Sequence, residues 1–241
     1  DDKGNAAGEM ASLGTVDLGA STIAITAGGK HTCAILAGGG VKCWGRGEYG
    51  RLGYDSTDHK GNEAGEMAGL STVNLLGASA IAIAAGFSHT CAILVGGGVK
   101  CWGKGAYGRL GYDSTDDKGD QVDEMAGLSA VNLNASAIAI AAGGLHTCAI
   151  LEGGGVKCWG WGYEGQLGYD STDNKGDAAG EMASLGTVNL GASAIAITAG
   201  GYHTCAILDS GGVKCWGGGW SGRLGYDSKD NKGDAAGEMA G

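Results

Sequence analysis

One stretch of fifteen residues, His31 to Gly45, occurs four times in this chain of 241 residues. The other copies begin at His89, His146 and His203, so the histidines lie 58, 57 and 57 residues apart. Each copy starts with His-Thr-Cys-Ala-Ile-Leu and ends with Val-Lys-Cys-Trp-Gly. Self-similarity at a fixed period near fifty residues is typical of propellers, solenoids and repeat arrays. The remaining residues must therefore connect and support four copies of one structural unit.

Each copy predicts a β-hairpin, because two short, mostly apolar runs flank a turn that contains glycine. If the turn is centred on Gly38, Cys33 faces Cys43 and Ile35 faces Val41. Directly opposed residues of an antiparallel pair have Cα atoms about 4.5 to 5.5 Å apart, which a disulfide can span. The two cysteines are ten residues apart in every copy, so we predict four disulfides that use all eight: Cys33–Cys43, Cys91–Cys101, Cys148–Cys158 and Cys205–Cys215.

Zinc is the main alternative for the cysteines. Because side chains alternate along a strand, His31, Cys33 and Cys43 would lie on one face of the hairpin. Structural zinc sites usually have closer cysteines and a fourth ligand, and no matching fourth residue is evident. The disulfide is therefore favoured over zinc and over free thiols. A hydrogen-bonded structural role is favoured for the histidine over a catalytic one.

The whole unit predicts an all-β fold. Two more strand candidates, 15–18 and 21–27, precede the first hairpin, and the 52 glycines suit many short strands joined by turns. Four short strands make one blade of a propeller. We therefore predict a single β-propeller-type array of four repeats of about 57 residues, each a four-stranded blade. The approximate units are 1–57, 58–115, 116–172 and 173–229, and 230–241 begins a further unit.

The net charge and the cysteine content indicate which partners the protein can bind and in which compartment it is found. The formal net charge is −10, which argues against binding to nucleic acid phosphates. No apolar run approaches eighteen residues, so no membrane span is expected. No signal peptide is visible at Asp1. Paired cysteines indicate an oxidising compartment, and we expect an extracellular or cell-surface location.

The repeat resembles that of the regulator of chromosome condensation family, which reads roughly Ala-Gly-x-x-His-Thr-x-Ala-Leu and then Gly-x-Val-x-x-Trp-Gly-x-Asn-x-x-Gly-Gln-Leu-Gly. The third unit shows Ala142-Gly-Gly-Leu-His-Thr-Cys-Ala-Ile-Leu151, followed by Gly155-Val-Lys-Cys-Trp-Gly-Trp-Gly-Tyr-Glu-Gly-Gln-Leu-Gly168. The resemblance covers all four units and implies a β-propeller, typically of seven blades with four strands each.

The chain departs from the family pattern in three ways. It has four repeats, it adds the cysteine pair, and it has a long acidic linker in place of a short one that contains proline. The nuclear founding member of the family exchanges nucleotide on a small GTPase and binds nucleosomes, and the acidic charge and paired cysteines argue against that role here. Because an extracellular enzyme inhibitor is also built from such repeats, the resemblance implies that the scaffold can serve as a secreted binder.

A candidate protein-binding face consists of positions that differ between otherwise similar units. They lie directly before each repeat histidine and in the loop that follows each Val-Lys-Cys-Trp-Gly segment. Aromatic residues and arginine on a rigid surface are typical of binding hot spots, although drift at exposed turns would produce the same variation. The predicted face contains Lys30, Arg46, Tyr49, Lys104, Tyr107, Trp161, Tyr163, Tyr202 and Trp220.

Calcium is the one cofactor that the sequence leaves open. The linker after the third hairpin contains carboxylates around a glycine turn, and calcium binds oxygen-rich loops. Its spacing departs from the EF-hand pattern, which favours a solvated turn instead. The candidate ligands are Asp170, Asp173, Asp177 and Glu181. No nucleophile–base pair or phosphate loop recurs in the units, so we expect a protein that is not an enzyme.

The expected function is an extracellular, disulfide-stabilised scaffold that is structural or binds a protein. The alternative is a secreted inhibitor that binds an enzyme through the aromatic loop face. Residues 1–12 and 230–241 are nearly the same linker, whereas the terminal repeats of a self-contained array are normally atypical because they cap the core. We therefore expect a segment of a longer array or a chain that joins head to tail with copies of itself.

Overall fold

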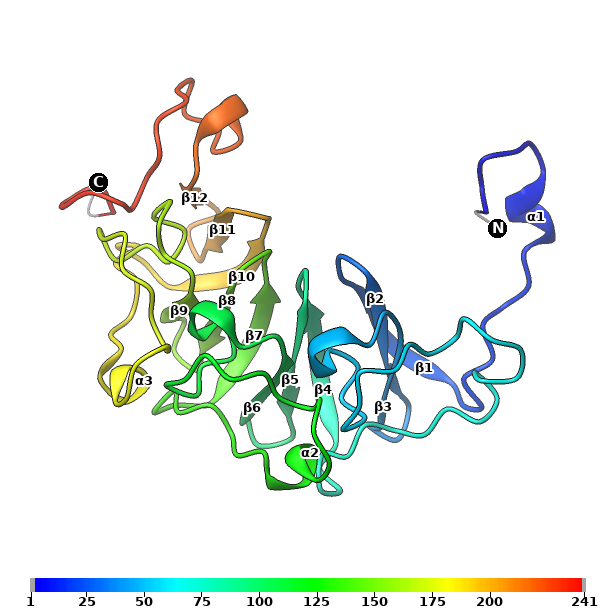
Figure 1. The fold of residues 1–241 in the computed structure, drawn as a ribbon. Coiled ribbons are helices and arrows are strands. Elements are labelled where there is room, and N and C mark those ends of the chain that lie inside the picture. The colour runs from blue at the N-terminus through cyan, green and yellow to red at the C-terminus, as the bar shows by residue number, and fades with distance from the viewer. Residues whose placement is uncertain (1–2, 240–241) are drawn as a thin grey trace.

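The computed structural model describes residues 3–239 and contains four three-stranded antiparallel sheets (Figure 1). The sheets are β1 (Thr22–Ala27), β2 (His31–Leu36) and β3 (Val41–Gly45); β4 (Ala80–Ala85), β5 (His89–Leu94) and β6 (Val99–Gly103); β7 (Ala137–Ala142), β8 (His146–Leu151) and β9 (Val156–Gly160); and β10 (Ala194–Ala199), β11 (His203–Leu208) and β12 (Val213–Gly217). They follow one another around an arc in chain order, with the two ends of the chain at the ends of the arc.

Short helical segments lie in the chain outside the sheets. The linkers contain α1 (Glu9–Ser12), α2 (Glu124–Gly127) and α3 (Glu181–Ser184), and three 3-10 turns follow hairpins: η1 (Glu48–Gly50), η2 (Ala106–Gly108) and η3 (Trp220–Gly222). Within residues 3–239, no helix has the length and apolar character needed to cross a membrane.

The predicted hairpin register is confirmed. Cys33 pairs with Cys43 and Ile35 with Val41, and the equivalent pairs recur in the other three sheets. The turn depends on Gly39, whose φ of 80° lies in the left-handed region and whose added Cβ would lie 2.4 Å from the Ser79 Cβ. The sequence pattern therefore fixes both the turn and the facing cysteines.

The predicted fourth strand is wrong, because each sheet described in residues 3–239 has three strands. The segment expected to form that strand in the second unit lies along β3 of the first sheet. It is attached there by one bond, from the Val73 N–H to the Val41 carbonyl at 2.8 Å. The linker also forms an isolated bridge to β3 between Lys60 and Gly45. Residues 61–72, between these two contacts, form turns and no strand, so no continuous ladder forms.

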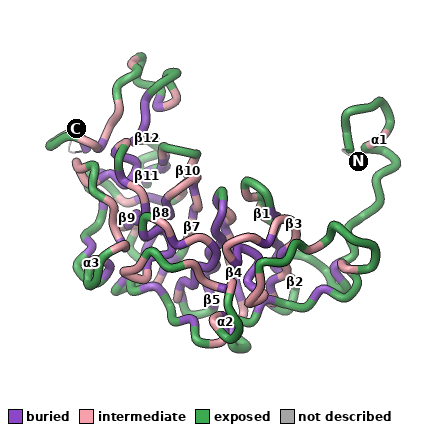
Figure 2. The backbone as a smooth tube through the Cα atoms, in the orientation of Figure 1, coloured by how far each residue is buried: buried purple, intermediate pink, exposed green. Residues whose placement is uncertain are grey.

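Successive sheets are held together by apolar side chains from both sides of each interface. Between the first two sheets, Ile35 and Val41 pack with Leu94 and Trp102 in a cluster that includes the Cys33–Cys43 disulfide. Equivalent residues form the next two interfaces. Figure 2 shows buried positions along the sheets, whereas the N-terminal segment is mostly exposed and the linkers mix buried, intermediate and exposed positions. Burying an aliphatic side chain contributes about 1.5 to 3 kcal/mol, so these interfaces carry much of the fold's stability.

The acidic linkers also connect neighbouring units. Oδ1 of Asp55, which follows the first hairpin, accepts a hydrogen bond at 2.8 Å from the backbone N–H of Met125, which follows the second. The Met125 side chain is fully buried in the core between the first two sheets. The same contact joins Asp113 to Met182 and Asp170 to Met239. The linker that follows the second sheet thus packs against the interface between the first and second sheets, and the later linkers do the same one unit further on.

Candidate protein-binding face

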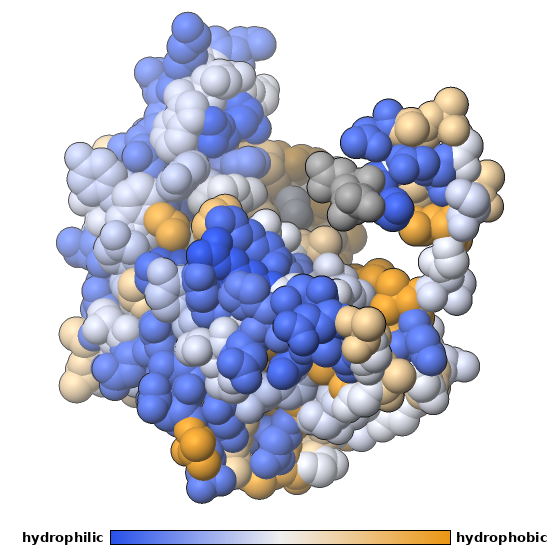
Figure 3. All heavy atoms as spheres, turned by 45° about the vertical axis from the view of Figure 1, so that its right-hand side comes forward, coloured by the Kyte–Doolittle hydropathy of each residue, from blue (hydrophilic) through white to orange (hydrophobic). Residues whose placement is uncertain are grey.

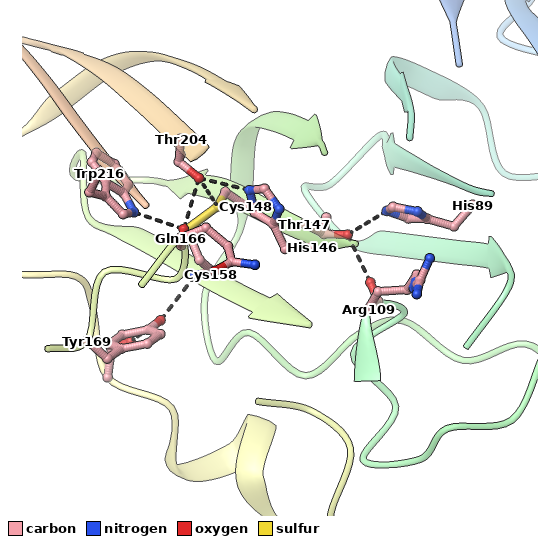
Figure 4. The surroundings of a disulfide bond; sticks show 11 residues. His89, Arg109, His146, Thr147, Cys148, Cys158, Gln166, Tyr169, Thr204 and Trp216 are labelled. Atoms are coloured by element: carbon pink, nitrogen blue, oxygen red, sulfur yellow. Dashed lines mark hydrogen bonds between the residues drawn. A yellow bond between two sulfur atoms is a disulfide. The ribbon is translucent and has the colours of Figure 1, made fainter. Parts of the chain in front are cut away.

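The histidines that open the first three hairpins each link two neighbouring sheets (Figure 4). His146 Nε2 lies 2.8 Å from Thr204 Oγ1, and that hydroxyl donates to the backbone carbonyl of Gln166 at 2.9 Å. Since the hydroxyl gives its proton to the carbonyl, it accepts the Nε2–H of a neutral imidazole. Equivalent chains are His31–Thr90–Arg51 and His89–Thr147–Arg109. These contacts give the histidines the structural role that we expected.

Burial keeps these histidines neutral. It lowers the pKa of His146 to about 3, with a further contribution from the positive charges of His203 and Arg109. Burial, together with the charge of Arg51, lowers the pKa of His31 to about 4. A general acid or base works best with a pKa near the operating pH, so neither imidazole is suited to proton transfer at neutral pH.

The cysteines form four disulfides inside the hairpins: Cys33–Cys43, Cys91–Cys101, Cys148–Cys158 and Cys205–Cys215. All eight lie in the part of the chain that the structure describes, and none is free. The disulfide prediction is confirmed. The zinc alternative is wrong, because a zinc ligand must be a thiolate and every sulfur is bonded to another sulfur.

Backbone hydrogen bonds bring the two kinds of variable position together. The N–H of Arg46, directly after the first hairpin, donates to the Lys30 carbonyl at 2.9 Å, and Lys104 makes the same bond to Ser88. Trp161 and Gly218 bond in this way to Leu145 and Tyr202. The residue before each histidine therefore always lies beside the start of the loop that follows the hairpin. All four loop pairs lie at the same end of their sheets.

An aromatic strip crosses the loops of the second, third and fourth sheets. The Trp161 ring stacks on Tyr163 with a centroid distance of 5.9 Å and lies 6.3 Å from Tyr107 and 5.6 Å from Tyr202. Tyr202 continues the strip to Trp220 at 5.5 Å. Such spacings are those of interacting aromatic pairs. Five residues predicted separately from four loops thus form one continuous surface.

The other four predicted residues form a cationic region at the first two sheets. Lys30, Arg46, Tyr49 and Lys104 line one pocket of about 370 Å³, and Tyr107 of the aromatic strip lines it as well. The Lys104 ammonium lies 4.5 Å from the centre of the Tyr49 ring. We call this surface and the aromatic strip together the loop face. The structure brings all nine predicted residues into it, and their role in binding stays a prediction.

The sequence interpretation missed two arginines of the loop face. Arg51 and Arg109 line the same pocket, and both are almost fully buried. They occupy the position at which the family pattern has glutamine, as Gln166 does in the third unit. That departure from the pattern was the signal that could have identified them.

The carboxylates considered for calcium hold the backbone of the linkers. Glu181 Oε2 accepts three backbone N–H groups, from residues 176 to 178, at 3.0 to 3.2 Å. Both Asp170 oxygens accept backbone N–H groups of the last linker, and Asp177 accepts the Asn174 amide. Among residues 3–239, no three His, Cys, Asp or Glu side chains are grouped to hold a metal ion. Calcium at Asp170, Asp173, Asp177 and Glu181 stays a prediction.

Comparison with known proteins finds sequence similarity to a ubiquitin-protein ligase and to a light receptor. The chain is 31% identical over 211 residues to the human E3 ubiquitin-protein ligase HERC2, covering 87% of this chain and 4% of that protein. It is 31% identical over 214 residues to the ultraviolet-B receptor UVR8 of Arabidopsis thaliana, covering 86% of this chain and 44% of the receptor. The chain thus spans less than half the length of these relatives.

Solved structures share the fold. Human WBSCR16 matches with a TM-score of 0.72 and 19% identity over 90% of this chain and 53% of that one. Yeast RCC1 (Prp20), solved with Kap60, matches with a TM-score of 0.66 and 21% identity over 88% and 48%. The model of the regulator of chromosome condensation (RCC1) repeat matches residues 23–51, 80–109, 137–166 and 194–222. One match in each of the four units, together with the shared β-propeller fold, identifies the four units of this chain as repeats of the regulator of chromosome condensation family.

Proposed function

We propose that this chain is an extracellular, non-catalytic binding module that recognises a protein partner through its loop face. The observation that carries the proposal is the aromatic strip, which is continuous across three sheets and partly open to solvent. Tyr163 is 64% exposed although it stacks on Trp161. Aromatic side chains fixed by their neighbours lose little entropy on binding and are typical interface anchors.

Two further features support this role. Each loop is attached to a disulfide-closed hairpin, so the face is supported by a rigid frame. Four disulfides also favour an oxidising compartment, which is the basis for an extracellular location. An enzyme is one such partner, and in that case the module acts as a secreted inhibitor.

The test is capture of a partner from the medium or cell surface of the source organism, using the wild-type chain and a Trp161→Ala/Tyr163→Ala variant. We expect the variant to keep its thermal unfolding temperature and to lose the partner. Val122→Ala is the matched control, because Val122 is 80% exposed in a linker outside the loop face. Equal capture by all three chains would place binding elsewhere and contradict the proposal.

A second candidate function is assembly through the outer surfaces of the first and last sheets. Ile207 and Val213 of the last sheet are 41% and 61% exposed, whereas their equivalents Ile35 and Val41 are fully buried between sheets. At the first sheet, Trp44 is only partly buried, whereas Trp102 at the same position is fully buried. Figure 3 shows hydrophobic residues gathered beneath the N-terminal segment, on the side of the first sheet. The two surfaces are therefore the two halves of the interface that joins sheets within the chain.

A further unit of the same repeat fits each surface, and a second copy of the chain can supply it. We expect light scattering to show an average mass that rises with concentration above the 23.7 kDa of one chain. Val213→Glu should reduce this rise, whereas Ile138→Glu, at a position exposed in an interior sheet, should not. A monomer at every concentration would contradict assembly through these surfaces.

A further inference from the structure

The cationic region of the loop face stands out in a chain of formal net charge −10. Five cationic side chains line its pocket together with a single carboxylate, that of Glu48: Lys30, Arg46, Arg51, Lys104 and Arg109. Glu48 forms salt bridges with Arg46 and, at 3.9 Å, with Arg51. The pocket thus keeps an excess of positive charge after its internal ion pairs are formed.

Arg109 is a buried cation of this pocket that forms no salt bridge with the described residues. It occupies the same repeat position as Arg51, but Ala106 stands where the first unit has Glu48. Arg109 donates through Nε to the Ala106 carbonyl at 2.9 Å and through Nη1 to the Gly144 carbonyl at 3.5 Å. Among residues 3–239 it forms no ion pair with a carboxylate, and it is 1% exposed. Burial also lowers its pKa to about 10.

A buried charge is costly unless a partner compensates it, and arginine pairs best with a carboxylate. The first unit supplies such a carboxylate from its own chain. The second unit presents the same guanidinium at the wall of an open pocket. Asp117 raises the pKa of Arg109 but forms no salt bridge with it, so among the residues described the guanidinium has no directly bonded carboxylate. The difference between Glu48 and Ala106 therefore leaves room for a carboxylate from outside the chain.

Apolar side chains surround this position. Phe87, which is 51% exposed, and Leu145 line the pocket together with Tyr107. Tyr107 is also the first ring of the aromatic strip and lies 6.3 Å from Trp161. A ligand that reaches Arg109 therefore contacts apolar and aromatic surface at the same time. We therefore expect the ligand to contain a carboxylate next to an apolar or aromatic side chain.

We propose, on the basis of the protein-binding role above, that this pocket takes an acidic, aromatic-containing segment of the partner, with one carboxylate paired to Arg109. The ligand class is a peptide and not a nucleic acid. The positive region is local and acidic linkers surround the sheets, so the many phosphates of a nucleic acid would meet repulsion beyond the pocket.

The test uses fluorescein-labelled peptides of eight residues and fluorescence polarisation at low and high salt. One peptide has three Glu or Asp residues and one Trp; the others replace the acidic residues by Lys or by Ser, and a single-stranded oligonucleotide of similar length completes the set. We expect the acidic peptide alone to bind, with an affinity that falls as salt rises.

Ala106→Glu is the decisive variant, because it gives Arg109 the carboxylate that Arg51 already has. We expect binding to weaken by about thirtyfold or more, as for the loss of a buried charge pair across an interface. Arg109→Gln, which introduces the residue of the third unit, should weaken binding similarly. Arg223→Gln, at the same position outside the pocket, should leave it unchanged. Thermal unfolding checks that each variant is folded.

Equal binding of the neutral or basic peptides, tighter binding of the oligonucleotide, no binding of the acidic peptide, or an unchanged affinity in Ala106→Glu would each overturn the inference. The captured partner separates this inference from the proposed function. A partner lost by the Trp161→Ala/Tyr163→Ala variant but retained by Ala106→Glu would uphold the binding face and refute its acidic specificity. A partner retained by both would refute the two together.

Discussion

The sheet interfaces and the loop face differ in how the repeats use their residues. Each interior interface is built from the same set of side chains: a disulfide, an isoleucine, a valine and a tryptophan recur in three clusters. The loop face crosses the same sheets with a different residue from each unit, such as Arg46, Lys104, Trp161 and Gly218 at one position. Close packing restricts an interior residue to one shape, whereas an exposed loop position is restricted only by its backbone.

Invariant and variable positions of one repeat therefore have different roles. Invariant positions determine the stability of the arc, and variable positions determine what its loop end can contact. Substitutions a few residues apart should therefore have opposite consequences, and the chain offers such a pair in its third unit.

The largest expected effect is that of Trp159→Ala. Trp159 is fully buried between the second and third sheets, and removing a buried tryptophan side chain costs about 3 to 5 kcal/mol. Tyr163→Ala, four residues later on the loop face, should change the free energy of unfolding by less than about 0.5 kcal/mol, as is usual for exposed positions. Urea denaturation followed by circular dichroism measures both. Similar losses for the two variants would break the proposed division between interface and loop face.

Periodicity in the sequence predicted the hairpins whose side chains form the interfaces. The hairpin register, the four disulfides and the all-β class all result from alternation and from the ten-residue spacing of the cysteines. The missing fourth strand could not be predicted, because the segments at 72–75, 130–133 and 187–190 are strand-like in pattern. Their pairing is decided by where the linker leaves the sheet edge, which is a tertiary property.

The sequence predicted which residues belong to the loop face but not how they are arranged. Variation between units identified the nine residues, whereas the connection through Tyr107 depends on the spacing of neighbouring sheets. The burial of Arg109 depends on the same packing. The linker carboxylates were interpreted as solvated or calcium-binding groups because their partners are backbone N–H groups. The N–H groups bound by Glu181 lie close to it in the sequence, whereas the N–H group bound by Asp55 is 70 residues away. No pattern of side chains in the sequence identifies these backbone donors.

The second prediction tests the interfaces through the histidine framework. The pKa of His146 is about 3 in the folded chain, because of burial first and then of the charges of His203 and Arg109, and near 6.5 when unfolded. Between these values the unfolded state binds more protons, so the free energy of unfolding falls as the pH falls. The stabilisation is complete above pH 6.5 and decreases by about 1.4 kcal/mol for each pH unit below it.

Denaturant unfolding at pH 7 and pH 5 measures this dependence. His146→Gln should reduce the change in stability between the two pH values without abolishing it, because burial also lowers the pKa values of His31 and His89. His59→Gln controls for the removal of a histidine that is exposed in a linker, and its pH dependence is compared with that of His146→Gln. An unchanged slope in His146→Gln would show that this imidazole takes up its proton equally in both states.

The smallest expected effect concerns the linkers, which lie outside both regions compared above. Glu181 holds three backbone N–H groups through one oxygen, while its other oxygen lies 3.7 Å from Lys175 Nζ. Glu181→Gln removes the charge but keeps an oxygen acceptor, so we expect a loss of about 1 kcal/mol. Glu152→Gln, in an exposed hairpin turn, should have no measurable effect. Because these oxygens are already bound to the chain, adding calcium or a chelator should not move the unfolding temperature. A rise with calcium that Glu181→Gln abolishes would instead show that the linker carboxylates exchange their backbone partners for the cation.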